Sequence, residues 1–165
     1  MSFDTFLELA TVEGESTAAG FEKKIEIYSF SWGASNPVTV GSGTGGMTGG
    51  KVSISSFNFM KKTEKSSAKL FQACATGQHF PTATVTMRKA TGTAGEQKAF
   101  LVYKFTEIMV ESIQWSGSSG GDDTPTESVS LAFAKVEITY SMQDPKGGMA
   151  VAGQAAWDLT KVSGK

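Results

Sequence analysis

The amino-acid sequence predicts a mainly β protein, namely a compact β-barrel of two antiparallel sheets with one flanking α-helix. Strand-like alternation of apolar and polar residues recurs along the 165-residue chain, whereas only one segment has a helical pattern. The 19 glycines exceed the average share, as expected for a protein with many turns. In three of the predicted strands, moreover, the apolar residues change from one face of the strand to the other.

This change of face predicts a strongly curved sheet. In one long strand Val129 and Leu131 occupy one face, Val136 and Ile138 occupy the other, and Ala134 lies at the switch. Because side chains alternate along a strand, one buried face cannot hold both sets. Either a β-bulge redirects the strand, or the strand buries its second face against another molecule. The same switch recurs in two further segments, residues 25–32 and 52–59.

The predicted strands are rich in β-branched and aromatic residues and are bounded by turn residues. In chain order they cover residues 3–9, 25–32, 52–60, 83–90, 100–105, 108–115 and 127–142, with a short last strand around residues 156–160. The segments 100–105 and 108–115 are either two consecutive strands or one strand that bends near Thr106 and Glu107. A turn is expected at residues 91–97.

One segment, Ser67–Thr76, has the pattern of a helix. Ser66 or Ser67 can cap its N-terminus, and Gly77 stands where a glycine commonly ends a helix. Its apolar stripe consists of Leu70, Phe71 and Cys74.

A glycine-rich segment separates two of the strands. Residues 33–50 contain seven glycines and one proline, and little that could build a core. Structureless loops longer than about 15 residues are uncommon in compact domains unless they have a function. We therefore favour a flexible loop that becomes ordered against a neighbour over a disordered surface loop. The chain is expected to form a single domain, residues 1–165, with an extended loop at about residues 33–51.

Composition and charge exclude several classes of partner. The net charge is −1 and Arg88 is the only arginine, so no nucleic acid is expected as a partner. No apolar run approaches the length of a membrane span, and no membrane insertion is expected. A single cysteine, Cys74, cannot form an internal disulfide, which suits the cytoplasm. The amino-terminal residues lack the basic and apolar regions of a signal peptide.

The candidate enzymatic sites are weak. Residues 45–52 lack one residue of a phosphate-binding P-loop, because Val52 stands where a Ser or Thr would bind magnesium. A strand follows this segment, whereas a P-loop must be followed by a helix. Cys74 and His79 provide two potential ligands, fewer than a zinc site needs. We expect Asp122 and Asp123 to be solvated turn residues, and we expect no catalytic residue, no cofactor and no metal.

Two further features have simple interpretations. Lys61 and Lys62 are expected to be solvent-exposed charges at a strand end that discourage edge-to-edge pairing. Ser29 and Ser31 alternate with aromatic residues, so their hydroxyls face away from the core. They belong either to an ordinary solvent face or to a smooth, weakly polar wall inside a channel.

A set of short motifs runs in order along almost the whole chain. The motifs are Gly14-Glu15-Ser16, Ser29-Phe30-Ser31-Trp32-Gly33, Cys74-Ala75-Thr76-Gly77, His79-Phe80-Pro81, Thr86-Met87-Arg88-Lys89-Ala90 and Trp157-Asp158-Leu159. In this combination the sequence resembles the haemolysin co-regulated protein (Hcp) family, the tube proteins of bacterial type VI secretion.

The resemblance implies a structural role and no enzymatic activity. Head-to-tail hexameric rings would stack into a hollow tube, which a contractile sheath ejects behind a spike protein and which can carry small effectors. The protein would be cytoplasmic before assembly and then secreted by the type VI system without a signal peptide. The lumen would be lined by Ser29 and Ser31. The ring-stacking loop would consist of Val40, Gly41, Ser42, Gly43, Thr44, Gly45, Gly46, Met47, Thr48, Gly49, Gly50 and Lys51.

Two other functions remain open at this point. The first is a monomeric or dimeric β-barrel module that binds a peptide or a small ligand in a groove beside its helix. The second is a nucleotide-using enzyme that relies on the glycine-rich loop.

Overall fold

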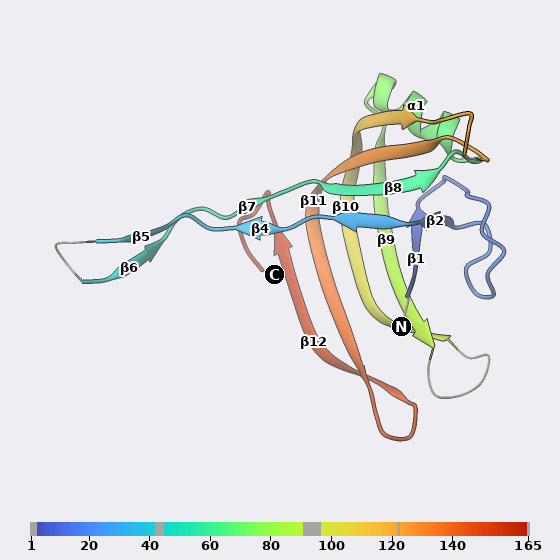
Figure 1. The fold of residues 1–165 in the computed structure, drawn as a ribbon. Coiled ribbons are helices and arrows are strands. Elements are labelled where there is room, and N and C mark those ends of the chain that lie inside the picture. The colour runs from blue at the N-terminus through green and yellow to red at the C-terminus, as the bar shows by residue number, and fades with distance from the viewer. Residues whose placement is uncertain (1–2, 42–44, 91–96, 122, 165) are drawn as a thin grey trace.

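The computed structural model describes residues 3–41, 45–90, 97–121 and 123–164, and excludes the side chains of residues 48 and 90. Figure 1 shows a curled antiparallel sheet, one helix at its upper end and a narrow two-stranded ribbon that extends from its side. The predicted class, a mainly β barrel with one flanking helix, is confirmed.

The elements follow the predicted order, with more strands than expected. They are β1 (Asp4–Leu9), β2 (Ile25–Ile27), β3 (Ser29–Ser31), β4 (Ala34–Ser35), β5 (Val38–Val40), β6 (Met47–Gly49), β7 (Ser53–Ile54), β8 (Phe57–Lys62), α1 (Ser67–Thr76), β9 (His79–Ala90), β10 (Gln97–Ser116), β11 (Thr126–Gln143) and β12 (Met149–Asp158). The turn expected at residues 91–97 lies almost entirely outside the described residues.

Eight of the strands form one continuous sheet. Its order is β2-β1-β9-β10-β11-β8-β3, and β12 adds to the lower part of β11. The strands β2 and β3 follow each other directly, but β2 pairs with β1 and β3 pairs with β8. Between them, the Tyr28 N–H donates to the Met60 carbonyl at 2.9 Å. Both ends of the sheet thus meet in one stretch of chain, which closes the upper barrel.

The switches of apolar face coincide with breaks or bends in the strands. Tyr28 separates β2 from β3, and Ser55 and Ser56 separate β7 from β8. In the long pair β10 and β11, the pairing skips Glu107 and Ala134, and Glu107 has a φ of 57°. The register is the same on both sides of this position, so the β-bulge considered for the switch at Ala134 is not there; the register shift of this pair lies between Val110 and Ser112. Of the two forms considered for residues 100–115, the structure has the single strand.

The core lies inside the upper barrel and is rich in aromatic rings. Phe57 and Phe105 lie 5.0 Å apart between ring centroids, and Phe105 lies 4.5 Å from Phe133. Trp32 packs edge-on against Phe105 at 5.7 Å. Because Trp32 follows β3 directly, this packing anchors the closing segment to the opposite strands.

The helix has the predicted bounds and ends at Gly77, whose φ is 71° and whose N–H donates to the Ala73 carbonyl at 3.0 Å. Leu70 and Ala73 are buried against the barrel. Phe71 was predicted to be part of the apolar stripe, but 54% of its surface is exposed, and it packs on Trp115 with centroids 5.8 Å apart. The helix therefore covers the barrel with a narrower face than expected.

The last strand begins earlier than predicted. We expected it around residues 156–160, but β12 spans Met149–Asp158 and pairs with β11 from Lys135 to Gln143. Its first half has a single β-branched residue, Val151, among Ala150, Ala152 and Gly153, and alanine and glycine are depleted in strands. The pairing partner, rather than local propensity, therefore fixes this strand.

Candidate functional site

The glycine-rich segment is an extended arm, which we define as residues 33–55. At its root, the Gly33 N–H donates to the Ser55 hydroxyl at 2.8 Å and the Ser55 N–H donates to the Gly33 carbonyl at 2.9 Å. Beyond the root, β4 pairs with β7 and β5 pairs with β6. Figure 1 shows the arm projecting well beyond the barrel. The expected loop is thus a two-stranded ribbon.

Close backbone packing explains a glycine within the arm. The Gly50 N–H donates to the Pro37 carbonyl at 2.9 Å and to the Asn36 Oδ1 at 2.8 Å. A Cβ atom at Gly50 would lie 2.7 Å from the Pro37 Cγ, which is closer than real Cβ contacts. The close approach of Pro37 therefore favours a residue without a side chain at position 50.

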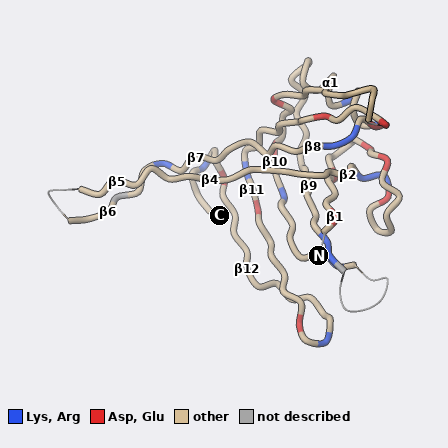
Figure 2. The backbone as a smooth tube through the Cα atoms, in the orientation of Figure 1, with Lys and Arg blue, Asp and Glu red and all other residues tan. Residues whose placement is uncertain are grey.

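The surface of the arm is apolar and almost uncharged. Val38, Val40 and Met47 are 58%, 70% and 77% exposed. Lys51 is the only charged residue between residues 33 and 55, and nearly the whole arm is tan in Figure 2, whereas charges gather on the barrel and its loops. The arm thus presents apolar side chains that no part of its own protomer covers among the described residues.

The residues predicted for ring stacking fall on the outer half of this arm. Val40 ends β5, Gly41 donates its N–H to the Gly46 carbonyl at 3.1 Å, and Met47 begins β6. The remaining described members are Gly45, Thr48, Gly49, Gly50 and Lys51, and the members outside the described residues are Ser42, Gly43 and Thr44.

An apolar groove of about 270 Å³ lies where the arm leaves the barrel. Ala34, Val52 and Ile54 of the arm form one wall. The other walls belong to the barrel and to β12, and include Trp32, Ile138 and Trp157. The root of the arm therefore adds to the apolar surface of the protomer.

Ser29 and Ser31 lie on β3 and are exposed, as their alternation predicted. Phe30 between them points inward and stacks on Phe57 with centroids 5.7 Å apart. The two hydroxyls therefore face away from the core, on the outer side of the closing strand.

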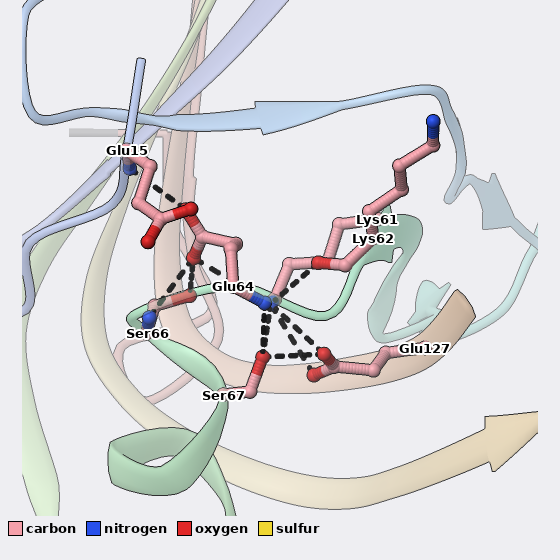
Figure 3. Close-up of polar contacts among 7 residues, drawn as sticks. All are labelled: Glu15, Lys61, Lys62, Glu64, Ser66, Ser67 and Glu127. Carbon is pink, nitrogen blue, oxygen red and sulfur yellow. Dashed lines mark hydrogen bonds and ion pairs between the residues drawn. The ribbon is translucent and has the colours of Figure 1, made fainter. Parts of the chain in front are cut away.

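A buried ionic cluster joins the upper barrel to the helix (Figure 3). Lys61 and Glu127 face each other across β8 and β11, both side chains are fully buried, and the Lys61 Nζ lies 3.2 Å from the Glu127 Oε1. The Lys61 Nζ also donates to the Ser67 Oγ at 2.9 Å, and the Ser67 hydroxyl in turn donates to Glu127. A buried charge is tolerated when it is paired and hydrogen-bonded, as both are here.

Glu64 extends this cluster to the surface. Its Oε1 lies 3.6 Å from the Lys61 Nζ, and its Oε2 accepts the Glu15 N–H at 2.7 Å. Four parts of the chain are thereby tied together, namely β8, β11, the start of α1 and the loop that contains Glu15. Lys61, Ser67 and Glu127 are almost completely buried, and their contacts are to one another and to the chain around them, so the cluster holds these parts of the fold together.

The prediction for Lys61 was therefore wrong, although that for Lys62, which is exposed, agrees with the structure. A signal for the cluster was present in the sequence. Lys61 shares its strand face with Phe59, and Glu127 shares its face with Val129, so alternation alone placed both charges on core-facing positions.

The weak enzymatic candidates gain no support from the geometry. The Cys74 thiol donates to the Glu111 carbonyl at 3.6 Å, while His79 is exposed at the start of β9. The glycines before Val52 lead into β7, so no helix N-terminus faces them. Within the described part of the chain, no cluster of three or more possible metal ligands occurs, and no helix is both long and apolar enough to cross a membrane.

Comparisons with known proteins agree on one family. Residues 6–140 match the family model described as type VI secretion system effector, Hcp. Protein hcp1 of Pseudomonas aeruginosa is 37% identical over 147 residues, which cover 89% of this chain and 88% of the relative. A solved structure of a type six secretion system protein superimposes with a TM-score of 0.92 at 38% identity, covering 99% of this chain and 100% of the other. Hcp1 from Salmonella typhimurium superimposes with a TM-score of 0.79 at 30% identity over the full length of both chains.

Proposed function

Because this chain belongs to the Hcp family of type VI secretion proteins, we propose that it is a non-enzymatic tube subunit whose copies form hexameric rings that stack into a hollow tube. The observation that carries the proposal is the arm, which is ordered into strands yet exposes Val38, Val40 and Met47. An isolated two-stranded hairpin is marginally stable in water. The arm therefore fits a segment that is completed by another copy.

Ring formation needs two different complementary surfaces on each protomer, because head-to-tail contacts within a ring are heterologous. The protomer exposes apolar side chains in several separate places besides the arm. These are Phe3, Tyr28, Met60, Phe71, Trp115, Tyr140, Met142, Val151 and Val162. These side chains are available for contacts with neighbouring copies in the proposed ring.

Stacking of the rings is assigned to the arm, from Val40 to Lys51. Each arm contributes a small contact and loses conformational freedom when it docks. Six such contacts around one ring act together, since each one that forms raises the effective concentration of the others. Weak individual contacts thus give stable stacking of one ring on the next, and the stacking still forms reversibly.

The proposal includes the partners and location that the family resemblance implied. The tube would be made in the cytoplasm, enclosed by a contractile sheath, capped by a spike protein and exported without a signal peptide. Small effectors would travel in the lumen, with Ser29 and Ser31 on its wall.

The alternative of a ligand-binding module rests on the groove beside α1. This groove measures about 220 Å³ and is lined in part by Lys69, Gln72 and Gln78. Ligand pockets are usually about 300–1,000 Å³ and mostly apolar, so the groove is small and polar by comparison. The tube subunit is therefore the better-supported function.

Light scattering coupled to size-exclusion chromatography tests ring formation. The 17.4 kDa chain is expected to elute as a hexamer at tens of micromolar, and a strict monomer would contradict the proposal. Deletion of residues 41–50 is expected to leave the rings intact and to abolish end-to-end stacking in electron micrographs. Collapse of the protomer fold after this deletion would refute the stacking role of the arm.

A further inference from the structure

The pairing of β8 with β11 is short, and its apolar residues do not define a single register. On the core side the pairs are Phe57 with Leu131 and Phe59 with Val129, and all four side chains are almost completely buried. A slip by one residue would turn these side chains to the outside. A slip by two residues would keep all of them on the core side, because side chains alternate with a period of two.

The outward side of the same two strands is equally permissive. Its pairs are Asn58 with Ser130, Met60 with Ser128, and Lys62 with Thr126. After a slip by two residues Met60 would face Ser130 or Thr126, which are again small hydroxyl residues. The Ser130 hydroxyl donates to the Asn58 Oδ1 in the observed register, and such a neutral bond contributes only modestly to the choice.

The buried ion pair of Lys61 and Glu127 distinguishes these registers. The two residues are directly opposite each other, both side chains are fully buried, and the Lys61 Nζ lies 3.2 Å from the Glu127 Oε1. After a slip by two residues in one direction Lys61 would face Val129, and after a slip in the other direction Glu127 would face Phe59. Each slip thus places a buried charge opposite an apolar side chain, which is costly.

Ser67 at the start of α1 strengthens this choice. Its hydroxyl accepts a hydrogen bond from the Lys61 Nζ at 2.9 Å and donates one to the Glu127 carboxylate. The Glu64 N–H donates to the same Ser67 Oγ at 2.9 Å, which holds the hydroxyl in place. Slipped residues would be diagonal neighbours, about 7–8 Å apart instead of about 5 Å. One fixed hydroxyl therefore contacts both charged groups only in the observed register.

The register of β8 also sets the position of the arm. One end of the arm leads into β8, and the other end follows β3, which pairs with β8 from Ser29 to Ser31. The two ends are joined at Gly33 and Ser55. The strands β3 and β8 and the arm would therefore shift together, by about 7 Å for a slip of two residues.

We propose that the buried Lys61–Glu127 pair is a positioning device, which selects one register of β8 against β11 and thereby fixes the place from which the arm projects. This inference rests on the proposed stacking of rings, because six arms dock together only when all six project from equivalent places. Replacement of a buried ion pair by apolar residues of similar volume is often neutral or stabilising, so the pair acts on the choice of register more than on the stability of the barrel.

Disulfide trapping in the Cys74→Ala protein reports the register. Met60→Cys is combined with Ser128→Cys for the observed register, and with Ser130→Cys or Thr126→Cys for the two slipped registers. A disulfide needs Cβ atoms about 3.5–4.5 Å apart, a separation that opposed positions approach and diagonal positions exceed. With the ion pair intact, the combination with Ser128→Cys is expected to oxidise at least about a hundredfold faster than either of the others.

The decisive variant replaces both charges, as Lys61→Met with Glu127→Leu. It is expected to keep its circular dichroism spectrum and thermal midpoint, while the preference for the observed register falls below about tenfold. The matched control is Lys24→Met with Glu8→Leu, which removes a partly exposed pair with a 2.8 Å contact and should keep the full preference. An unchanged preference in the Lys61 and Glu127 variant would overturn the inference. Loss of its folded spectrum would also overturn it, since the pair would then be needed for folding itself.

Electron microscopy of the same Lys61→Met and Glu127→Leu variant, without added cysteines, tests the link to the arm. Rings are expected to form, but the tubes should be at least about twofold shorter than those of the wild-type protein, because arms in different places cannot dock together. Tubes of wild-type length from a protein that oxidises in slipped registers would overturn the positioning of the arm. Absence of stacked rings in the wild-type protein would instead contradict the proposed function, and disulfide trapping would still decide the register.

Discussion

The upper barrel and the arm are both antiparallel β structure, but they are held together in different ways. In the barrel, the facing strands β8 and β11 bury Phe57, Phe59 and the Lys61–Glu127 pair. In the arm, β5 and β6 form the same kind of backbone ladder, yet every described side chain of both strands is exposed. Backbone pairing alone therefore defines the shape of the arm, whereas burial defines the barrel.

This difference separates stability from assembly. Removal of apolar surface from water is the main favourable term in folding, so the barrel provides the free energy of unfolding of the protomer. The arm contributes little to it and keeps its apolar side chains available. Substitutions in the barrel are therefore expected to lower the stability of the protomer, whereas substitutions in the arm are expected to weaken assembly.

The largest effect on stability is expected from Glu127→Ala. The substitution leaves the Lys61 ammonium buried without its carboxylate partner, which usually costs about 3–5 kcal/mol. Urea unfolding followed by circular dichroism measures the change. Glu137→Ala is the matched control, because its carboxylate lies in a partly exposed pair, 3.8 Å from the Lys135 Nζ, and should matter by less than about 1 kcal/mol. Equal losses in the two variants would show that the buried pair does not stabilise the barrel.

A smaller and local effect is expected from Gly50→Ala. The new Cβ would lie 2.7 Å from the Pro37 Cγ, and such overpacking costs about 1–3 kcal/mol of local stability. Amide exchange at Gly50 and Gly41 should therefore become about tenfold faster or more, while global unfolding changes by less than about 0.5 kcal/mol. A large loss of global stability would mean that the arm and the barrel fold as one unit.

Almost no change in stability is expected from the double substitution Val40→Ser and Met47→Ser. Both side chains are at least 70% exposed, and such surface changes usually lie within about 0.5 kcal/mol. Ring stacking, measured as tube length in electron micrographs, is nevertheless expected to fall sharply. Val151→Ser, at a 59% exposed position on β12, is the control for loss of an exposed apolar side chain. Tubes of normal length in the double variant would show that the side chains of Val40 and Met47 do not contribute to the stacking contact.

The smallest effect concerns the turn after β12. A hydrogen bond from the Thr160 hydroxyl, followed by those from the Lys161 and Thr160 N–H groups, lowers the pKa of the Asp158 carboxyl below its usual value of 3.8. A lowered folded-state pKa stabilises the turn above the unfolded pKa, and this contribution is lost as the pH falls through the folded value. An NMR titration of the Asp158 carboxyl carbon should give a midpoint below 3.8, and Thr160→Val should move it upward. A midpoint at 3.8 or higher would contradict these bonds.

The sequence predicted those parts of the fold that depend on local signals. Gly77 ends the helix because the left-handed conformation there suits glycine. Alternation indicated an irregularity near Glu107, which has a φ of 57°, but left open whether two strands or one strand would result. Local alternation also predicted that Ser29 and Ser31 point away from the core, although their role in a lumen remains a prediction.

The remaining features depend on partners distant in the chain. Lys61 is buried because Glu127, 66 residues later, faces it across two strands. The bounds of β12 are determined by its pairing with β11. The ribbon of the arm is held by backbone hydrogen bonds between β5 and β6, and these bonds leave no pattern of apolar and polar residues in the sequence. Sequence alternation could have flagged Lys61 as core-facing, but nothing local could show which charge would neutralise it.

Closure of the barrel at Tyr28 also bears on the order of folding. The strand β2 needs only its neighbour β1, but β3 needs β8, and β8 in turn needs β11, which enters the chain much later. Joining segments so far apart costs loop entropy, so we expect the seam between β3 and β8 to form last. A newly made protomer would thus be able to join the proposed ring only after β3 has paired with β8.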